Sequence, residues 1–294
     1  MRFRKIAIIG VGLLGGSLGM AVKRRKLARE VVGFVRRAAS IAECKKFRAV
    51  DYATRDLQEA VTGADLIILC TPLAQMRALV KLFLPTLKRG AIVTDVGSVK
   101  AGVVRELETL IAKAGAHFIG SHPMAGAEKT GVSAARVDLF VNAACVVTPT
   151  KRSNKAALRK VEQFWKAVGC RLLTIAPEVH DTLVSRSSHL PHILAATLVN
   201  RVLNPAYPAQ QEKLCANGFR DTTRIASGSP EMWRDITLAN RANLARALDQ
   251  FSADLQKLKR TLKKADGKAL AAFFEQAKQR RDSWCAGCAS PSPE

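Results

Sequence analysis

Three glycines near the start of the chain have the spacing of a site that binds a dinucleotide. Gly10, Gly12 and Gly15 follow an apolar run, Ile6 to Ile9, and precede an apolar helical stripe. The first glycine permits a tight turn, the second lets the backbone approach a pyrophosphate, and the third lets helix and strand pack closely. Free N–H groups and the helix dipole favour an anion there. We predict a dinucleotide site, against the alternative of a glycine-rich turn that binds nothing.

The end of the next expected strand indicates which dinucleotide is bound. In NAD sites, an acidic residue near this point binds the ribose 2′-hydroxyl. Here Val35 takes that place and is followed by Arg36, Arg37 and, slightly later, Ser40. No carboxylate would repel a 2′-phosphate, and two guanidinium groups could hold one. We expect a preference for NADP over NAD, unless the two arginines are only solvated charges on a loop.

Polar turns follow three further expected strands at their carboxyl ends, where cofactors bind in doubly wound sheets. They are the Cys-Thr-Pro turn at 70–72, the turn at 96–100, and the glycine-rich turn at 121–131, which contains His122. The predicted cofactor-binding residues are Gly10, Gly12, Leu13, Leu14, Gly15, Arg36, Arg37, Ser40, Cys70, Thr71, Pro72 and Gly97.

The elements that must position these turns alternate between strands and helices up to residue 176. Apolar runs predict strands at 6–9, 30–35, 64–70, 91–95, 117–120, 145–148 and 171–174. Such alternation predicts a mostly parallel sheet with helices on both faces. We therefore predict an α/β N-terminal Rossmann-type doubly wound sheet, followed by an all-α C-terminal domain.

Beyond Pro177 the strand pattern stops. We expect one long helix over 178–203, a second from 230 to about 264, and a third over roughly 268–282. A helical half that is not compact by itself commonly buries its apolar stripe against a second copy, so we expect a homodimer through this part. The predicted domains are a dinucleotide-binding domain at 1–176, a helical substrate and dimerisation domain at 177–284, and a loose tail at 285–294.

Composition narrows the class of protein. The net charge is +23, but the basic residues are spread over helix faces. Nucleic acid is therefore not the expected partner. The positive charge would instead attract an anionic cofactor and an anionic substrate. The sequence contains no run of about 18 apolar residues, so we expect no membrane span. Seven scattered cysteines indicate reduced thiols in a cytoplasmic protein. Cys285 and Cys288 form a single C-x-x-C, which is weak evidence for zinc, and we expect no metal.

Five short motifs occur in a fixed order along the chain. They are GSVK at 97–100, HPMAGAEKTGV at 122–132, SHLPH at 188–192, GFRDTTRIA at 218–226 and MWRDI at 232–236. With the glycine turn, this ordered set resembles the prephenate/arogenate (cyclohexadienyl) dehydrogenase family in its stand-alone form. The resemblance extends to about residue 282.

The resemblance implies NAD(P)-dependent oxidative decarboxylation of prephenate or arogenate, giving 4-hydroxyphenylpyruvate or tyrosine, in tyrosine biosynthesis. It implies that His122 takes the proton of the ring hydroxyl, a role that suits an imidazole with an ordinary pKa near 6.5. It also implies that Ser98 hydrogen-bonds the hydroxyl or this histidine. Ser98 could at the same time be a simple helix N-cap.

The same resemblance assigns the substrate side of the site. Arg224 corresponds to the residue that grips the ring carboxylate, which a planar guanidinium fork can do with two bonds, and its alternative is a surface salt bridge. Core packing is the alternative role for Trp233. The implied substrate-side residues are Arg224, His189, Trp233, Glu128 and Asp221. Ala127 departs from the family, because many relatives have a hydroxyl residue there that can donate a hydrogen bond.

Two other classes of protein stay open at this stage. A β-hydroxyacid or imine-type reductase also joins a dinucleotide domain to helices. Such enzymes typically use a lysine of the helical part as the catalytic acid, and the ordered histidine and arginine motifs fit them poorly. A non-catalytic NADP-sensing protein is the second alternative. Within the family, residues Val35 and Arg36 tilt the choice slightly toward arogenate, although cofactor and substrate preference are set at separate sites.

Overall fold

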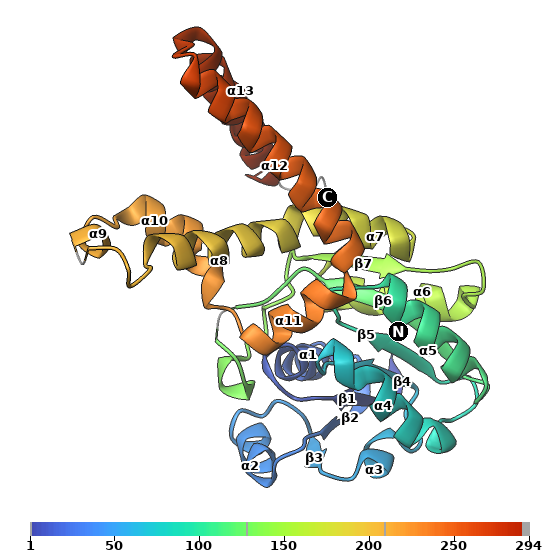
Figure 1. Cartoon of the computed structure of the whole chain (residues 1–294). Coiled ribbons are helices and arrows are strands. Elements are labelled where there is room, and N and C mark those ends of the chain that lie inside the picture. Colours follow the sequence, from blue (N-terminus) through green and yellow to red (C-terminus); the bar gives the residue numbers. More distant parts are fainter. Residues whose placement is uncertain (1, 128, 209, 290–294) are drawn as a thin grey trace. The chain divides into compact units, whose positions relative to one another are not determined.

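A single eight-stranded sheet organises the computed structural model, which describes residues 2–127, 129–208 and 210–289 (Figure 1). The strand order is β3-β2-β1-β4-β5-β6-β7-β8. All neighbouring strands are parallel except β6 and β7, which pair antiparallel. The strands are β1 Phe3–Ile9, β2 Ala28–Phe34, β3 Tyr52–Thr54, β4 Leu66–Leu69, β5 Ile92–Asp95, β6 His117–Pro123, β7 Ala144–Thr148 and β8 Arg171–Thr174.

Helices cover both faces of this sheet, because the side chains of β1 alternate between two apolar clusters. Ile6 and Ile8 belong to the cluster that includes residues of α1, α2 and α6, whereas Ala7 and Ile9 belong to the cluster with α3, α4 and α5. The predicted doubly wound α/β fold is therefore confirmed. The helices are α1 Leu13–Arg24, α2 Ala38–Lys46, α3 Leu57–Val61, α4 Leu73–Phe83, α5 Ala101–Ala112 and α6 Lys155–Val168.

The expected helix at 178–203 is present but contains an irregular turn. α7 (Pro177–Val184) runs through a π-helical turn, Ser185–His189, into α8 (Leu190–Val202). Pro191 has no N–H for the hydrogen bond of a regular α-helical turn, which favours such local widening. π-helical turns of this kind occur frequently at functional sites.

The expected helix at 230–264 is two helices. α11 (Pro230–Ala239) ends at Asn240, and α12 (Arg241–Lys263) begins immediately after it. The final helix, α13 (Gly267–Ala289), continues past the expected end near residue 282, so the prediction of a loose tail from 285 is wrong as far as Ala289. The two short helices between α8 and α11 are α9 (Gln210–Lys213) and α10 (Asn217–Thr223).

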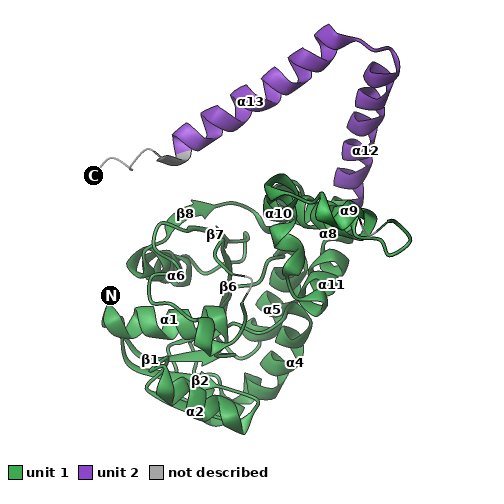
Figure 2. Cartoon of the chain, turned by 90° about the vertical axis from the view of Figure 1, so that its left-hand side faces the viewer, with its two compact units in different colours: residues 1–244 green, residues 245–294 purple. Residues whose placement is uncertain are grey.

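The last strand ends at Thr174, and the regular elements from Pro177 to Ala289 are all helices in the residues that the structure describes. By compactness the chain divides elsewhere, into residues 1–244 and residues 245–294, which Figure 2 distinguishes by colour. The first unit holds the sheet and the helices up to the start of α12. The second holds the rest of α12 and α13. Among the described residues, no helix combines the length and apolar character that crossing a membrane would require.

Candidate active site

A cavity of about 240 Å³ lies at the carboxyl ends of β1, β2 and β4. It is lined by eight of the twelve residues predicted to bind the dinucleotide: Gly10, Gly12, Arg36, Arg37, Ser40, Cys70, Thr71 and Pro72. Leu13, Leu14, Gly15 and Gly97 do not line it. Segments that are far apart in the sequence therefore meet at the edge of the sheet where the pattern placed them.

The three glycines of the turn have the separate steric roles that their spacing indicates. Gly10 has φ +98° and lies under the Cys70 carbonyl, which a Cβ would approach to 2.9 Å. A Cβ on Gly15 would lie 2.1 Å from the Gly10 carbonyl oxygen, so only glycine lets α1 pack this closely. A Cβ on Gly12 would meet no atom of the described residues within 4 Å, which leaves open space beside the backbone at the start of α1.

Two features of this cavity fit a phosphate-containing cofactor. Within the described part of the chain, the N-terminus of α1 has no side-chain cap and no acidic residue in its first turn, so its N–H groups are available to an anion. Thr71 Oγ1 is buried without a hydrogen-bond partner among the described residues, and a buried polar atom of this kind requires one. Gly12 and Thr71 both line this cavity, and the exposed Arg36 and Arg37 stand at its rim.

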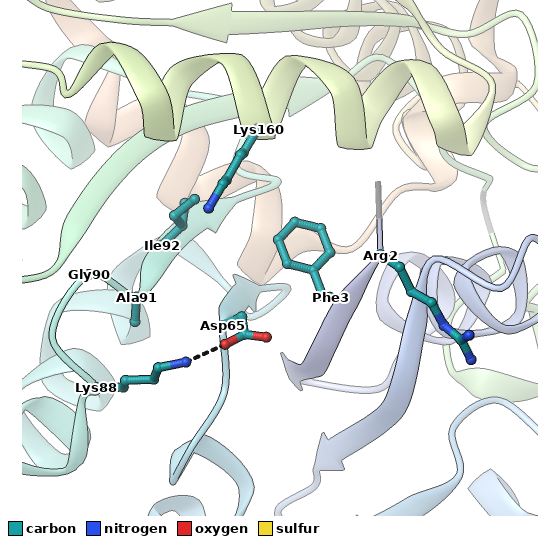
Figure 3. Close-up of a pocket in the computed structure, with 8 residues that line it drawn as sticks. All are labelled: Arg2, Phe3, Asp65, Lys88, Gly90, Ala91, Ile92 and Lys160. Atoms are coloured by element: carbon teal, nitrogen blue, oxygen red, sulfur yellow. Dashed lines mark hydrogen bonds and ion pairs between the residues drawn. The ribbon is translucent and has the colours of Figure 1, made fainter.

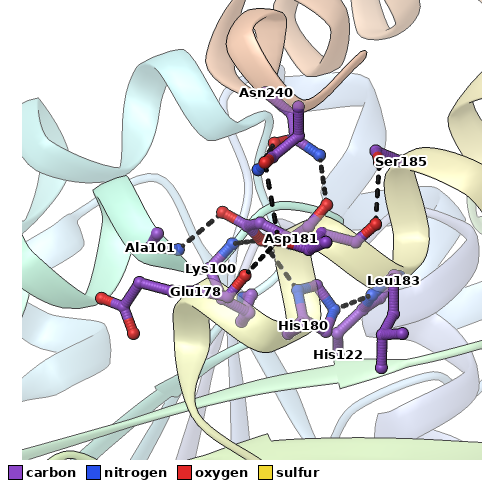
Figure 4. Close-up of polar contacts among 12 residues, drawn as sticks. Lys100, Ala101, His122, Glu178, His180, Asp181, Leu183, Ser185 and Asn240 are labelled. Carbon is purple, nitrogen blue, oxygen red and sulfur yellow. Dashed lines mark hydrogen bonds and ion pairs between the residues drawn. The ribbon is translucent and has the colours of Figure 1, made fainter. Parts of the chain in front are cut away.

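His122 lies at the carboxyl end of β6 and is the first member of a buried hydrogen-bond chain (Figure 4). Its Nδ1 is 2.9 Å from Nε2 of His180, and His180 Nδ1 is 2.8 Å from Oδ1 of Asp181. Both partners lie on α7. Burial lowers the pKa of His122 well below 6.5, and electrostatic interactions with His180, Lys100 and His189 lower it further. The ring is therefore kept neutral, the form in which a histidine can accept a proton.

Asp181 connects this chain to the turn that carries Ser98. Its two carboxylate oxygens accept the backbone N–H groups of Lys100 and Ala101 at 2.7 and 2.8 Å, so it caps the N-terminus of α5. Ser98 is half-buried just before this point and is not the N-cap, which is Lys100. The capping alternative for Ser98 is therefore wrong for α5.

A fully buried ion pair lies beneath the same turn. Lys100 Nζ pairs with the carboxylate of Asp95 at the end of β5 and donates to the Ser121 carbonyl at 2.9 Å. The Asp95 carboxylate also accepts the N–H groups of Gly97 and Ser121. These contacts connect the ends of β5 and β6, which fixes the backbone on both sides of the Ser98 turn.

His189, in the π-helical turn, is a further buried histidine beside this network. Asn240 Nδ2 lies 3.2 Å from His189 Nδ1 and donates to the Asp181 carbonyl at 2.8 Å. Burial lowers the pKa of His189 to about 4, with Asp181 and the nearby Ser98 backbone opposing the shift and His180 and His192 adding to it. Its Nε2 is buried without a hydrogen-bond partner among the described residues.

Trp233 of α11 lies beside these histidines. Its ring makes an edge contact with His189, with centroids 6.2 Å apart, and stacks on His192 at 3.6 Å. His192 Nδ1 donates to the Ser188 carbonyl within its own helix. Trp233 is half-buried, so it packs between helices and is adjacent to His189 at the same time.

The remaining predicted substrate residues lie on a separate segment or outside the description. Asp221 lies in α10, and Arg224 begins a 3₁₀ turn, Arg224–Ser227, that packs on α8. Both side chains are exposed. Glu128 lies outside the residues that the structure describes. The hydrogen-bond chain therefore joins His122 and His189, but it does not include the predicted carboxylate-binding arginine.

A second cavity, of about 280 Å³, lies at the opposite edge of the sheet (Figure 3). Asp65 and Lys88, which form an ion pair at 2.6 Å, line it together with Arg2 and Lys160. It is adjacent to the amino-terminal ends of β1, β4 and β5. Doubly wound sheets bind their ligands at the carboxyl ends, so this cavity is not a candidate for the cofactor.

Comparison with known proteins decides which family this arrangement represents. Residues 18–174 match the family model for the prephenate dehydrogenase nucleotide-binding domain, and residues 176–276 match that for the prephenate dehydrogenase dimerization domain. The chain belongs to the prephenate dehydrogenase family. A cyclohexadienyl dehydrogenase of Zymomonas mobilis is 33% identical over 282 residues, which are 95% of each chain.

Solved structures of this family have the same fold. Prephenate dehydrogenase from A. aeolicus, in complex with hydroxyphenyl propionate and NAD+, superposes with a TM-score of 0.90 at 31% identity, covering 96% of this chain and 99% of that one. Synechocystis arogenate dehydrogenase gives a TM-score of 0.81 at 30% identity, covering 95% and 99%. The chain is therefore an oxidoreductase of the prephenate dehydrogenase family with a nicotinamide cofactor.

Sequence reasoning missed the residues that support His122 and His189. His180, Asp181 and Asn240 belong to none of the motifs, and Lys100 is the last residue of the GSVK motif but was given no role. The one local signal was the His-Asp pair at 180–181, directly after the predicted start of the helical part. A carboxylate that is hydrogen-bonded to one ring nitrogen of a histidine sets which nitrogen of that ring carries the proton.

Proposed function

We propose that this protein oxidatively decarboxylates prephenate, arogenate or both, in tyrosine biosynthesis. In this reaction a hydride leaves ring carbon 4, carbon dioxide leaves carbon 1, and the ring becomes aromatic, which supplies much of the driving force. When bound, the nicotinamide would accept the hydride. The observation that carries the proposal is His122, a buried and neutral imidazole at the carboxyl end of β6, within an enzyme family that performs this chemistry.

His122 is the proposed base that takes the proton of the ring hydroxyl as the hydride departs. Its lowered pKa keeps the ring unprotonated at neutral pH, so it is ready to accept. Ser98, half-buried in the turn that Asp181 and Lys100 hold in place, is proposed to hydrogen-bond the hydroxyl or the imidazole. Fixed positions for base and substrate reduce the entropy that the reaction must otherwise lose.

We propose that the substrate carboxylate on the ring binds Arg224, and that His189 and Trp233 contact the substrate. His189 and Trp233 are supported by their contact with each other and by the connection of His189 to the His122 chain. For Arg224, Asp221 and Glu128 the support is their place in the family motifs. A planar guanidinium binds a carboxylate with two parallel bonds, so Arg224→Ala should raise the KM of the substrate more than it lowers kcat.

We propose NADP as the preferred cofactor. Arg36 and Arg37 follow the end of β2 at the rim of the cavity, and Ser40 lies in the first turn of α2 beside them. Arg55 Nε donates to the Arg36 carbonyl at 3.2 Å, which brings a third guanidinium close to this rim. A 2′-phosphate placed here would meet positive charge and no carboxylate among the lining residues.

We also propose a homodimer that functions in the cytoplasm. The dimer is supported by the match of residues 176–276 to a dimerization domain and by exposed apolar side chains on α12 and α13. The cytoplasm is supported by free thiols at Cys44, Cys70, Cys145, Cys170, Cys215 and Cys285, because proteins of that compartment keep their cysteines reduced. The predicted boundary between a dinucleotide domain and a helical domain at residue 176 is part of the same proposal.

The initial rate of reduced-nicotinamide formation tests the function directly. Prephenate and arogenate would each be supplied with NADP and with NAD, and absorbance would be followed on the purified protein. Turnover of either substrate with NADP, faster than with NAD, is expected. Absence of reduction in all four combinations by a folded protein that binds NADP would contradict the proposed reaction, and a strong preference for NAD would contradict the role of Arg36 and Arg37.

A further inference from the structure

The Asp181 carboxylate fixes the position of protons along the chain that ends at His122. Its two oxygens accept backbone N–H groups, at 2.7 Å from Lys100 and 2.8 Å from Ala101, and an N–H can only donate. The N-terminus of α5 stabilises the anion. Because a carboxylate can only accept, Nδ1 of His180, 2.8 Å from Oδ1, must carry a proton.

The proton on His180 determines which nitrogen of His122 is free. In a neutral ring protonated at Nδ1, Nε2 has a lone pair and accepts. His122 Nδ1 lies 2.9 Å from that atom and must therefore donate to it. A neutral His122 with its proton on Nδ1 leaves Nε2 as the atom that can accept a proton from a substrate.

Asn240 fixes His189 in the opposite tautomer. The Asp181 backbone carbonyl can only accept, so the atom of Asn240 that lies 2.8 Å from it is the amide nitrogen. Asn243 donates to the other amide atom, the oxygen, at 2.8 Å, which agrees with this orientation. The same amide nitrogen lies 3.2 Å from His189 Nδ1, which must accept. The proton of a neutral His189 is then on Nε2, the buried atom without a partner among the described residues.

We propose that Asp181, His180 and Asn240 are positioning residues that set opposite tautomers at the two histidines: His122 Nε2 is a proton acceptor and His189 Nε2–H is a hydrogen-bond donor. The inference rests on the proposed function for its substrate, since the donor would bind an oxygen of the cyclohexadiene acid, either a carboxylate or the ring hydroxyl. Figure 4 shows Asp181 between His180 and Asn240, with hydrogen bonds to both.

The arrangement also connects the charge that the reaction creates on His122 to the Asp181 carboxylate. The proton leaves the hydroxyl oxygen and bonds to Nε2 of His122. The Nδ1–H of the resulting imidazolium still donates its hydrogen bond to Nε2 of His180. His180 in turn donates to the Asp181 anion, so the new positive charge is coupled to a negative one through a single ring. A proton could shift from His122 Nδ1 to His180 without any heavy atom moving.

Nitrogen-15 NMR of the histidine side chains tests the tautomers without turnover. The chain has five histidines, and replacing each one by glutamine in the full-length protein assigns its pair of ring nitrogens. We expect His122 to be protonated only at Nδ1 and His189 only at Nε2 near pH 7.5. A His122 protonated at Nε2, or a His189 protonated at Nδ1, would overturn the proposal.

Two substitutions at His180 test the positioning role by kinetics. His180→Leu removes the acceptor for His122 Nδ1–H, whereas His180→Gln can keep an acceptor oxygen near that position. We expect His180→Leu to lower kcat about 10- to 1,000-fold with KM little changed, as for other groups that orient a catalytic histidine. His180→Gln should recover most of the lost rate, and the His122 tautomer should become mixed only in the leucine variant.

The controls separate this proposal from the proposed function. His117→Gln changes a histidine at the start of β6, outside the network, and should leave both kcat and the other four spectra unchanged. Equal kcat in the His180→Leu variant and the wild type, or a lower kcat with an unchanged His122 tautomer, would overturn the positioning role. If the expected tautomers are found but no substrate is turned over, only the proposed function fails.

Discussion

At the scale of single residues, the site depends on histidines that stay uncharged where most histidines would be half protonated. His122 is buried, and the neighbouring Lys100, His180 and His189 all disfavour a further positive charge. Its pKa is therefore well below 6.5, and the neutral form persists as the pH falls. A general base is active only while it is unprotonated.

This lowered pKa predicts the acid side of the pH profile of kcat/KM. The rate should stay constant as the pH falls through 6.5, where an ordinary histidine would become protonated, and decline only at lower pH. Rates measured in a constant-ionic-strength buffer series would show this. An acid limb centred at or above pH 6.5 would mean that the site does not hold His122 neutral in this way.

The two arginines at the cavity rim predict a selective loss. Charge-assisted hydrogen bonds contribute roughly 1.5–3 kcal/mol each, so removing both guanidinium groups should raise the KM for NADP by about 100-fold or more. The KM for NAD, which has no 2′-phosphate, should change little in the Arg36→Ala/Arg37→Ala variant. Arg29→Ala, an exposed arginine on β2 outside the cavity lining, is a matched control for lost charge. Equal effects on NADP and NAD would contradict the assignment.

At the scale of elements, the first strand, the glycine turn and α1 act as one unit whose glycines differ in function. Gly15 is required for packing, because its Cβ would overlap the Gly10 carbonyl, whereas Gly12 borders open space. Short sequence patterns predicted both roles, since the spacing follows directly from the geometry of a strand, turn and helix.

The two glycines predict different outcomes for the same change. Gly15→Ala should push α1 away from β1 and lower the free energy of unfolding by about 1–3 kcal/mol or more, as overpacking does. Gly12→Ala should leave the unfolding temperature unchanged but weaken cofactor binding by about tenfold or more, because a methyl group would occupy the space beside the pyrophosphate. Thermal unfolding and calorimetric titration with NADP separate the two. Equal loss of stability in both variants would contradict the account.

Elements without a strong periodic signal were not predicted. β3 has three residues, Tyr52–Thr54, and is too short to show alternation. The break at Asn240 interrupts an apolar stripe that continues on both sides, so the pattern predicted a single helix. Asn240 ends α11 and uses its side chain in the network, which is a tertiary role that local periodicity does not reveal.

At the scale of the whole molecule, the alternation of strands and helices predicted the fold and the order of motifs predicted the family, while the hydrogen-bond network was not predicted. His122, His180 and Asn240 lie far apart along the chain, and only the packing of α7 and the end of α11 near the end of β6 brings them together. The distances along the chain between these single residues follow no pattern, so a sequence motif cannot reveal that they meet. The Gly-rich turn, in contrast, is complete within six residues.

The helices beyond residue 244 predict the oligomeric state. Several large apolar side chains there are exposed, and a second copy would cover them. They are Leu255, Leu262, Phe273, Phe274 and Trp284.

Sedimentation equilibrium should give twice the chain mass of 31.9 kDa. Leu262→Glu together with Phe273→Glu should shift the protein toward monomer, whereas Leu82→Glu, at an exposed leucine of α4, should not. A monomeric wild-type protein at micromolar concentration would contradict the proposed dimer.

The most direct test of the proposed reaction measures both products at once. Carbon dioxide and reduced nicotinamide would be quantified from prephenate and from arogenate with NADP, for the wild type and for His122→Asn. We predict equal amounts of the two products from the wild type, and a 10²- to 10⁴-fold slower rate with unchanged NADP binding for His122→Asn, as expected for loss of a general base. Reduction without carbon dioxide release, or a fully active His122→Asn, would contradict the account.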